Sequence, residues 1–571
     1  MKSLRWNVKS SEDEHTVLSL AEELGITKPL ATILVQRGID TFDKAKYFFR
    51  PNLDDIHDPF LMKDMDKAID RIERALGDGE RILIYGDYDV DGTTAVSLVY
   101  SFFSNLTDNI DYYIPDRYGE GYGISFQGVD YADENDISLI IALDCGIKAN
   151  DKVAYANEKK IDFIICDHHR PGKNLPEASA ILDPKRDDCN YPYDELCGCG
   201  IGFKLVQAFS QKNDLPFEEL LQYLDLVAIS IGCDIVPITG ENRILAHYGL
   251  QQVNENPRTG IRCMLELLDL KKVLTITDLV FVIGPRINAA GRIAHAKKAV
   301  QLLISDTEQN AIEIGKRINE DNQNRRDLDK AITQESLTMI EENDFLLNAK
   351  SCVLHSPDWH KGVIGIVASR VIETHYRPTI ILTSTGNVAS GSARSVKGFD
   401  VYNAIDACSD LIDQFGGHKY AAGLTLPIKN IDSFREKFEK VVSSTITEEQ
   451  LTPEIEIDTE LTLTEINPKF YRILNQISPF GPKNMRPVFV SRGVLDSGYS
   501  RTVGADNLHL KLSVYQTGNT NFKVDGIAFN MGHHYAKISQ GIPFDIVYNV
   551  EENEWKDRVT LQLKIKDIRF I

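Results

Sequence analysis

Three aspartates alternate with other residues in one short stretch of the chain, where Asp87, Asp89 and Asp91 precede Gly92. The order D-x-D-x-D-G also begins the calcium-binding loops of EF-hands, which need a glutamate at the twelfth position and a helix on each side. The twelfth position here is Leu98, and the preceding "RILIY" is a short apolar run typical of a buried strand. We therefore interpret the three carboxylates as a cluster between a strand and a helix, where α/β folds place active sites.

Other apolar runs end in residues of the same chemical kind. "ISLIIAL" is followed by Asp144, "IDFIIC" by Asp167, His168 and His169, and "AISIGC" by Asp234. If each run is a strand of one parallel sheet, these ends converge on one crevice. Carboxylates and imidazoles grouped there suit Mg²⁺ or Mn²⁺, and bound cations would relieve the repulsion between the acids. The alternative is that each aspartate caps a following helix, which explains any one group more easily than all four.

The bulk properties describe an ordinary globular protein. The chain has 571 residues, of which 43% are hydrophobic and 26% charged, and this length suggests three or four domains. No apolar run reaches the roughly 18 residues of a membrane-spanning helix, and the N-terminus has no signal-peptide pattern. The net charge of −21 argues against binding of polyanions over the whole surface, but it allows a local basic groove. We expect a cytoplasmic protein without a membrane partner.

Nine cysteines are scattered along the chain, and this odd number is too small for a disulfide framework. Cys189, Cys197 and Cys199 raise the hypothesis of a zinc site, but their C-x-C spacing has no second pair at finger distance. We expect free cysteines packed in a glycine-rich turn instead.

The residue pattern changes along the chain and predicts five segments. Residues 1–50 are typical of a polar helical segment, and residues 51–295 alternate between buried runs and amphipathic helices, which predicts a doubly wound parallel sheet reaching to about residue 270. Residues 296–345 indicate long polar connector helices. Residues 346–447 suit a second α/β unit, and residues 448–571 contain short strands typical of a small β-barrel or sandwich. The predicted class is a multidomain α/β protein.

Several motifs also resemble those of a known family. "GDYDVDGTTA", "ALDCGI", "CDHHRPG" and "GCDIVPITGENR" resemble, in this order, the motifs of the DHH phosphoesterase superfamily. "YYIPDRYGEGYGIS", "GPRINAAGRI", "WHKGVIGIVASR", "GSARS" and "FGGHKYAAGL" are similar to motifs of its bacterial single-strand-specific 5′→3′ exonucleases. The resemblance runs from about residue 50 to the end, and it implies a DHH domain, a DHHA1 domain and a C-terminal OB-like barrel.

The resemblance implies a site with two ions, Mn²⁺ or Mg²⁺. Asp89 and Asp144 would bind one ion, with Asp87 as a further candidate ligand. The other ion would be bound by Asp91, Asp144, His168 and Asp234, so that Asp144 bridges the two. His169 would contact the scissile phosphate or orient the attacking water. Many relatives have a histidine four residues before the second aspartate of the loop, whereas this chain has Tyr85, which implies a first metal site that is weaker or depends more on Asp87.

The resemblance also implies contacts with DNA. The expected phosphate or 5′-end contacts are Arg117, Arg286, Asn288, Ser392 and Arg394, and His418 would close the active site from the second domain. Tyr118 and Tyr122 suit either base stacking or loop anchoring, and Trp359 suits either a core position or a stacking ring. His360, Lys361, Lys511 and Lys523 are weaker candidates.

The expected activity is two-metal hydrolysis of single-stranded DNA from the 5′ end to 5′-phosphorylated nucleotides, in recombination and repair. Expected partners are a single-strand-binding protein and a RecQ-type helicase, and the chain is expected to be a monomer. Two alternatives remain: a phosphoesterase acting on short oligonucleotides, cyclic dinucleotides or pyrophosphate, and a DNA-binding scaffold without catalysis.

Overall fold

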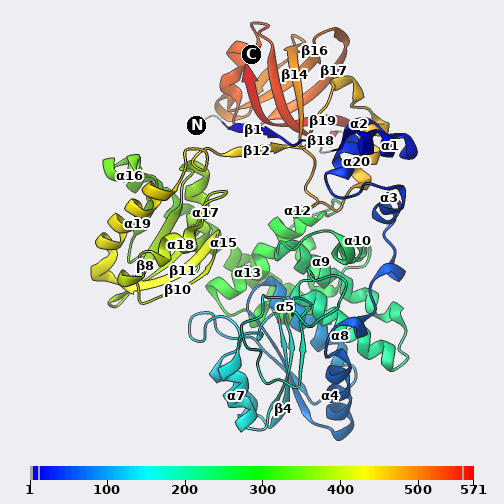
Figure 1. The fold of residues 1–571 in the computed structure, drawn as a ribbon, viewed down its shortest axis with the longest axis vertical. Coiled ribbons are helices and arrows are strands. Elements are labelled where there is room, and N and C mark those ends of the chain that lie inside the picture. Colours follow the sequence, from blue (N-terminus) through cyan, green and yellow to red (C-terminus); the bar gives the residue numbers. More distant parts are fainter. Residues whose placement is uncertain (1–3, 11–12, 556–557, 571) are drawn as a thin grey trace.

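The computed structural model describes residues 4–10, 13–555 and 558–570. Figure 1 shows three bodies: an α/β body in blue, cyan and green, a second α/β body in yellow-green, and an all-β body in orange and red. Within the described residues, no helix is long and apolar enough to cross a membrane.

The first body is built on a five-stranded parallel sheet. Its strands are β2 (Arg81–Gly86), β3 (Ile110–Tyr113), β4 (Ile137–Leu143), β5 (Asp162–Cys166) and β6 (Ala180–Leu182), in the order β3-β2-β4-β5-β6. Alternate side chains of β2 enter two different cores: Ile82 and Ile84 enter one, and Leu83 and Tyr85 the other. Helices cover both faces, so the predicted doubly wound sheet is confirmed. The face with Ile82 and Ile84 is covered by α4 (Met65–Asp78), α5 (Val90–Phe103) and α8 (Gly198–Lys212). The face with Leu83 and Tyr85 is covered by α6 (Phe126–Glu134) and α7 (Asn150–Glu158).

The strand order fixes where a ligand site can form. The chain leaves β2 toward β3 on one side, but β4 and the later strands extend the sheet on the other. In open α/β sheets this change of direction opens a crevice at the carboxyl ends of the two strands that flank it, which are β2 and β4 here. Those ends are followed by Asp87 in one case and by Asp144 in the other.

The sheet does not continue to residue 270 as predicted, because the chain after β6 is mostly helical. The helices here are α9 (Leu224–Cys233), α10 (Gly240–Glu255), α11 (Thr259–Leu267), α12 (Ile276–Asp278), α13 (Gly284–Ile293) and α14 (Lys297–Leu303). The strand predicted before Asp234 was therefore wrong, since that run is helix α9. Nine of its ten residues are buried, and a run that is apolar all round has no helical periodicity to distinguish it from a buried strand.

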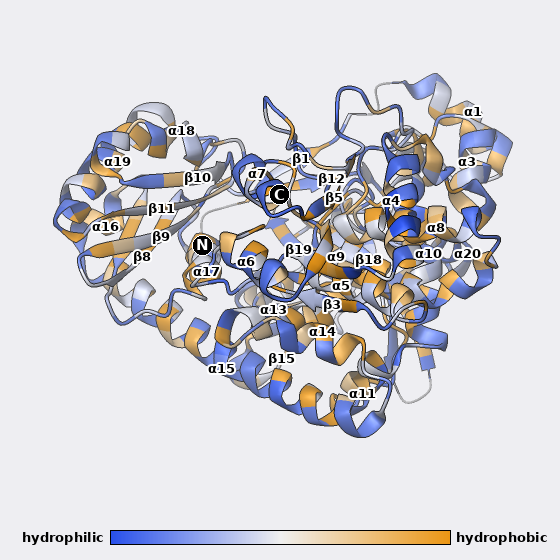
Figure 2. Ribbon diagram, turned by 90° about the horizontal axis from the view of Figure 1, so that it is seen from below, coloured by the Kyte–Doolittle hydropathy of each residue, from blue (hydrophilic) through white to orange (hydrophobic). Residues whose placement is uncertain are grey.

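The long helix α15 (Glu308–Glu341) connects the first body to the second. Figure 2 shows it running from α11 to α17 with mostly hydrophilic residues along its length. The second sheet has the order β10-β11-β9-β8-β7, formed by β7 (Cys352–His355), β8 (Thr379–Thr385), β9 (Val388–Arg394), β10 (Gln414–His418) and β11 (Ala421–Pro427). Helix α17 (Ile364–Thr374) packs on one face, and α18 (Val401–Asp406) and α19 (Ile431–Thr445) pack on the other. The short α16 (Asp344–Asn348) precedes β7.

The C-terminal strands close into a ring. The pairing runs β14–β18–β19–β17–β16, and β16 pairs with β14 again. The members are β14 (Phe489–Asp496), β16 (His509–Gln516), β17 (Asn519–Ala528), β18 (Phe544–Trp555) and β19 (Arg558–Phe570), with β13 (Thr459–Glu460) and β15 (Arg501–Val503) at the margins and α20 (Pro468–Gln476) and α21 (Tyr535–Ile538) beside them. Closure of this kind removes exposed strand edges, as in OB folds.

The N-terminal segment packs against the C-terminal body. Strand β1 (Arg5–Val8) pairs in parallel with β12 (Glu454–Ile457). Helices α1 (Glu14–Leu24), α2 (Lys28–Val35) and α3 (Phe42–Phe49) follow, and Leu20 and Leu30 share a core with Phe470 of α20. The described part of this segment thus consists of three helices and one strand.

Candidate metal centre and nucleic-acid interface

The loop between β2 and α5 is a tight turn. Asp89 is the N-cap of α5, and its carboxylate accepts a hydrogen bond from Gly92 N at 3.1 Å. A Cβ atom on Gly92 would lie 2.4 Å from the carbonyl oxygen of Asp87, so only glycine allows this turn. Asp87 is fully buried, and its Oδ1 accepts from Gly123 N at 3.2 Å while Oδ2 has no hydrogen-bond partner. The capping alternative thus holds for Asp89 but not for Asp87.

Asp91 connects three helices. Its carboxylate accepts hydrogen bonds from Gly198 N at 2.6 Å and Cys199 N at 2.7 Å, which are free donors at the start of α8. It also accepts from Ser230 Oγ of α9 at 2.6 Å. These bonds fix a buried carboxylate in one orientation.

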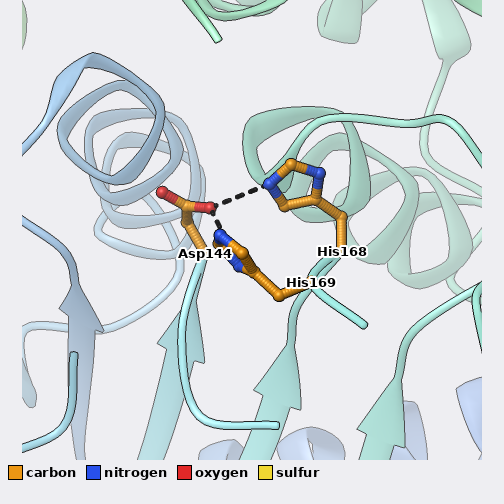
Figure 3. Close-up of side chains that lie close together, drawn as sticks. All are labelled: Asp144, His168 and His169. Atoms are coloured by element: carbon orange, nitrogen blue, oxygen red, sulfur yellow. Dashed lines mark ion pairs between the residues drawn. The ribbon is translucent and has the colours of Figure 1, made fainter. Parts of the chain in front are cut away.

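Asp144 and His168 meet where β4 and β5 end. Asp144 has a left-handed backbone, with φ of 58°. Nε2 of His168 lies 3.2 Å from Oδ1 of Asp144, 3.5 Å from Asp234 and 3.6 Å from Asp91. Figure 3 shows both histidine rings turned toward the same carboxylate oxygen of Asp144. One imidazole therefore touches three of the predicted carboxylate ligands.

His169 is held by Asp167, which the sequence indicated only as a potential metal ligand at a strand end. Its Nδ1 lies 2.8 Å from Oδ1 of Asp167 and 4.0 Å from Oδ1 of Asp144. Burial alone would lower the pKa of His169, but the hydrogen bond and charge of Asp167 outweigh it and raise the pKa to about 9. Tyr122 approaches the other nitrogen, with its hydroxyl 3.2 Å from Nε2. Asp167 lies within the "DHH" motif, but nothing in the sequence distinguished its carboxylate as a positioning group.

The acids of the cluster strongly perturb one another. Burial, followed by the neighbouring negative charges, raises the pKa of Asp87 to about 8 and that of Asp234 to about 8. The same two causes raise the pKa of Asp89 and hold that of Asp144 well above its usual range. Burial also lowers the pKa of His168, which favours a neutral imidazole. A neutral imidazole among buried acids is the donor set that a divalent cation needs.

Several buried atoms of this cluster have no hydrogen-bond partner, namely Oδ2 of Asp87, Oδ1 of Asp144 and both ring nitrogens of His168. Buried polar atoms are normally paired, and those left unpaired require an explanation. Ligand atoms lie within 4.8 Å of one another in two groups: Asp91 with His168 and Asp234, and Asp144 with His168 and His169. The residues present therefore fit bound divalent cations.

The predicted site residues differ in how far the structure gathers them. Asp91, Asp144, His168, His169 and Asp234 come together, whereas Asp87 and Asp89 lie outside the two groups and act on the others through charge. Tyr85 points away from the acids into the core of the opposite sheet face, where its hydroxyl donates to Gly123 O at 3.0 Å. All nine cysteines are free, and in the described part of the chain none belongs to a metal-binding group.

A group of arginines lies between the first and second bodies. Burial, followed by the charges of Arg117, Arg325 and Arg394, lowers the pKa of Arg292 to about 10, so these three arginines lie close enough to Arg292 for their charges to repel it. Within the residues that the structure describes, none of the four forms an ion pair with a carboxylate. Arg117 and Arg394 were predicted, but Arg292 and Arg325 were missed. Arg325 lies on α15, whose polar sequence indicated only a connector.

The other predicted DNA contacts are more dispersed. Ser392 accepts a hydrogen bond from Arg394 at 3.0 Å. Arg286 and Asn288 lie on α13, and Arg286 donates to Asn319 of α15 at 3.1 Å. His418 ends β10 on an exposed surface, and among the described residues it makes no ion pair or hydrogen bond with the acids. Lys523 lies over the ring of Tyr499, and Lys511 lies on the neighbouring strand β16.

The three aromatic candidates for base stacking occupy different environments. Trp359 is 3% exposed and donates from Nε1 to Glu335, so it is a core residue. Tyr118 donates from its hydroxyl to the carbonyl of Arg292, and its ring lies edge-on to His360. Tyr118 and Tyr122 are therefore anchored by their hydroxyl groups while their rings stay partly exposed.

Comparisons with known proteins agree with this arrangement. Residues 81–231 match the DHH family, N-terminal domain, residues 348–444 match the DHHA1 domain, and residues 457–567 match the RecJ OB domain. The chain is 37% identical over 569 residues to the single-stranded-DNA-specific exonuclease RecJ of Bacillus subtilis, covering 99% of this chain and 70% of that protein. It is 32% identical to the Escherichia coli protein of the same name, covering 88% of this chain and 90% of that protein.

A solved structure is similar over almost the whole chain. The structure of RecJ from Thermus thermophilus in complex with Mn²⁺ has a TM-score of 0.84 and 26% identity, covering 99% of this chain and 79% of that chain. One matched segment falls within each of the three bodies described above. With its DHH, DHHA1 and OB domains, this chain belongs to the RecJ family, whose members named here are single-stranded-DNA-specific exonucleases.

Proposed function

We propose that this protein is an exonuclease that degrades single-stranded DNA in the 5′→3′ direction to 5′-phosphorylated nucleotides, using two Mn²⁺ or Mg²⁺ ions. The observation that carries the proposal is the convergence of Asp91, Asp144, His168 and Asp234 at the switch point of the sheet, with buried ligand atoms left unpaired. Membership of the RecJ family supports the same class of reaction.

The cations would neutralise charge on the scissile phosphate and lower the pKa of the attacking water. The chain's own residues would position them. Asp91, Asp144, His168 and Asp234 would hold one ion, and Asp89 and Asp144 the other, with Asp87 as an additional ligand. The pKa of His169 is raised by Asp167, so at neutral pH its imidazolium would face the phosphate as a hydrogen-bond donor.

The direction of degradation would follow from where the terminal phosphate binds. Arg117, Arg292 and Arg394 have no carboxylate partner in the described structure. Arg292 and Arg394 donate to the neutral groups Gly362 O and Ser392 Oγ, so their positive charges remain uncompensated and can pair with a phosphate. Ser392, Arg286 and Asn288 would add contacts along the strand. His418 lies on β10 of the second body, and we propose that it approaches the reacting phosphate when DNA is bound.

The cellular role, the location and the partners are proposed from the resemblance to the family. The protein would act in DNA recombination and repair in the cytoplasm, as a monomer, with a single-strand-binding protein and a RecQ-type helicase as partners. Residues 51–295 would carry the chemistry, residues 346–447 would cover the strand, and residues 448–571 would bind it further along. Residues 1–50 and 296–345 would connect these parts.

A labelled strand tests the proposal. A 5′-phosphorylated single strand labelled at either end is incubated with the protein and Mn²⁺, beside the matching blunt duplex. We expect the 5′ label to appear first as a mononucleotide, and the duplex to resist. Release of the 3′ label first, or equal digestion of duplex and single strand, would refute it. A preference for a dinucleotide over the long strand would favour the small-substrate alternative.

A further inference from the structure

Ile235 follows Asp234 directly and has a left-handed backbone, with φ of 62°. A side chain branched at Cβ crowds the backbone in this region, so isoleucine there is an outlier. Among the described residues, eleven non-glycine residues have positive φ, and the other ten are Asp, Asn or Lys. Ile235 is therefore the residue least suited to the conformation that it adopts.

The backbone conformation itself has a clear local cause. Asp234 is the C-cap of α9, and its N–H donates to Ser230 O at 2.9 Å. A left-handed residue directly after the cap ends a helix and turns the chain away, and glycine or asparagine usually occupies that position. The need to end α9 at Asp234 explains the left-handed turn, but it does not explain an isoleucine.

Burial in the protein does not offset this strain. Ile235 is 68% exposed, whereas the nearby Val236 is 6% exposed and Ile238 is fully buried. Because the Ile235 side chain is exposed, burial contributes no stabilising free energy that would offset the backbone strain. The Cα atom of Ile235 lies about 3.8 Å from that of its chain neighbour Asp234. Asp234 belongs to the metal-binding group with Asp91 and His168. A strained apolar side chain thus stands in solvent beside the candidate reaction centre.

We infer that Ile235 contacts a nucleobase of the DNA strand next to the scissile phosphate. This inference rests on the proposed function. A strand whose phosphate lies at Asp234 brings bases to the rim of the site, and their faces are its apolar surfaces. Packing of an aliphatic side chain on a base face works for any base, which suits an enzyme without sequence preference. Removal of Ile235 from water would then occur only with DNA bound.

The test separates contact with the base from support of Asp234. Ile235→Asn and Ile235→Gly both tolerate the left-handed turn but lack the apolar side chain. Lys160→Gly is the matched control. Lys160 also follows a helix cap and has a φ of 62°, and it lies between α7 and the amino end of β5, whereas the acids follow the carboxyl ends of the strands. Single-turnover cleavage with Mn²⁺ is measured on an intact 5′-phosphorylated strand and on strands with an abasic first or second nucleotide.

All three variants are expected to raise Tm by about 2–4 °C, because each relieves a left-handed non-glycine residue or replaces it with a better tolerated one. Ile235→Asn and Ile235→Gly should lower kcat/KM on the intact strand by about tenfold, and by less than about twofold on the strand whose contacted base is missing. Lys160→Gly should leave cleavage of every strand unchanged.

Two results would overturn the inference while leaving the proposed function intact: full activity of both Ile235 variants on the intact strand, or the same fractional loss on intact and abasic strands. The second result would assign Ile235 to support of Asp234. A wild-type protein that cleaves no single strand would instead overturn the proposed function itself, and the inference with it.

Discussion

Metal binding by this protein should release protons, and the number released should depend steeply on pH. Asp87 and Asp234 have pKa values of about 8, because burial and neighbouring carboxylates disfavour their charged forms. At pH 7 each would carry about 0.9 proton, and at pH 9 about 0.1. Asp234 and Asp87 are both ligands in the proposed two-metal centre, and a carboxylate binds a cation in its ionised form. Loading of both ions at pH 7 should therefore expel about two protons from this pair, and loading at pH 9 about 0.2.

The same protons set the stability of the metal-free protein. In the unfolded chain these acids titrate near pH 4, but in the folded chain they hold protons up to about pH 8. Between these values the folded state binds more protons than the unfolded state, so the free energy of unfolding falls as pH rises through this window. Saturating Mn²⁺ should reverse the trend, since the bound ion stabilises the ionised acids.

Calorimetric titration with Mn²⁺ in two buffers of different ionisation enthalpy measures the released protons directly. Affinity should increase from pH 6 to pH 9, and Asp234→Asn should release about one proton fewer at pH 7. Release of less than about half a proton at pH 7, or release that does not change with pH, would refute the reasoning.

Three substitutions test other parts of the structure. Asp144→Ala removes a carboxylate shared by the cluster and should lower the cleavage rate by at least about 1000-fold with strand binding retained, measured by single-turnover kinetics and fluorescence anisotropy. Arg292→Gln should raise KM for a 5′-phosphorylated strand by about tenfold and reduce the salt slope of binding by about one, while Arg74→Gln, at an exposed arginine beside Asp162, should do neither. Arg243 donates to the carbonyls of Phe48, Gln476, Ile477 and Ser478, so Arg243→Met should cost about 2–4 kcal/mol by chemical denaturation, and an unchanged midpoint would contradict this role.

The sequence predicted the sheet and most of its ligand positions because parallel strands place their carboxyl ends together. The runs before Asp87, Asp144 and Asp167 are short and bounded by polar residues, so their strands were recognisable. The run before Asp234 has the same composition but forms helix α9. Its prediction as a ligand still placed it correctly near His168, because a helix end can reach the crevice from above the sheet.

Contacts between distant segments could not be read from local patterns. Arg292 and Arg325 are separated along the chain, and only the packing of the bodies brings their charges near Arg117 and Arg394. The docking of the N-terminal segment on the C-terminal body depends on β1 pairing with β12. The left-handed turn at Ile235 was equally hidden, because isoleucine is among the last residues expected there.

The central claim is that the acids at the switch point of the sheet form a two-metal centre for a DNA strand. Anomalous diffraction from crystals grown with Mn²⁺ and a short 5′-phosphorylated strand tests it most directly. We predict two anomalous peaks bridged by Asp144, one contacting Asp91, His168 and Asp234 and the other Asp89, with a phosphate of the strand between them. A single peak, or peaks away from these side chains, would contradict the account.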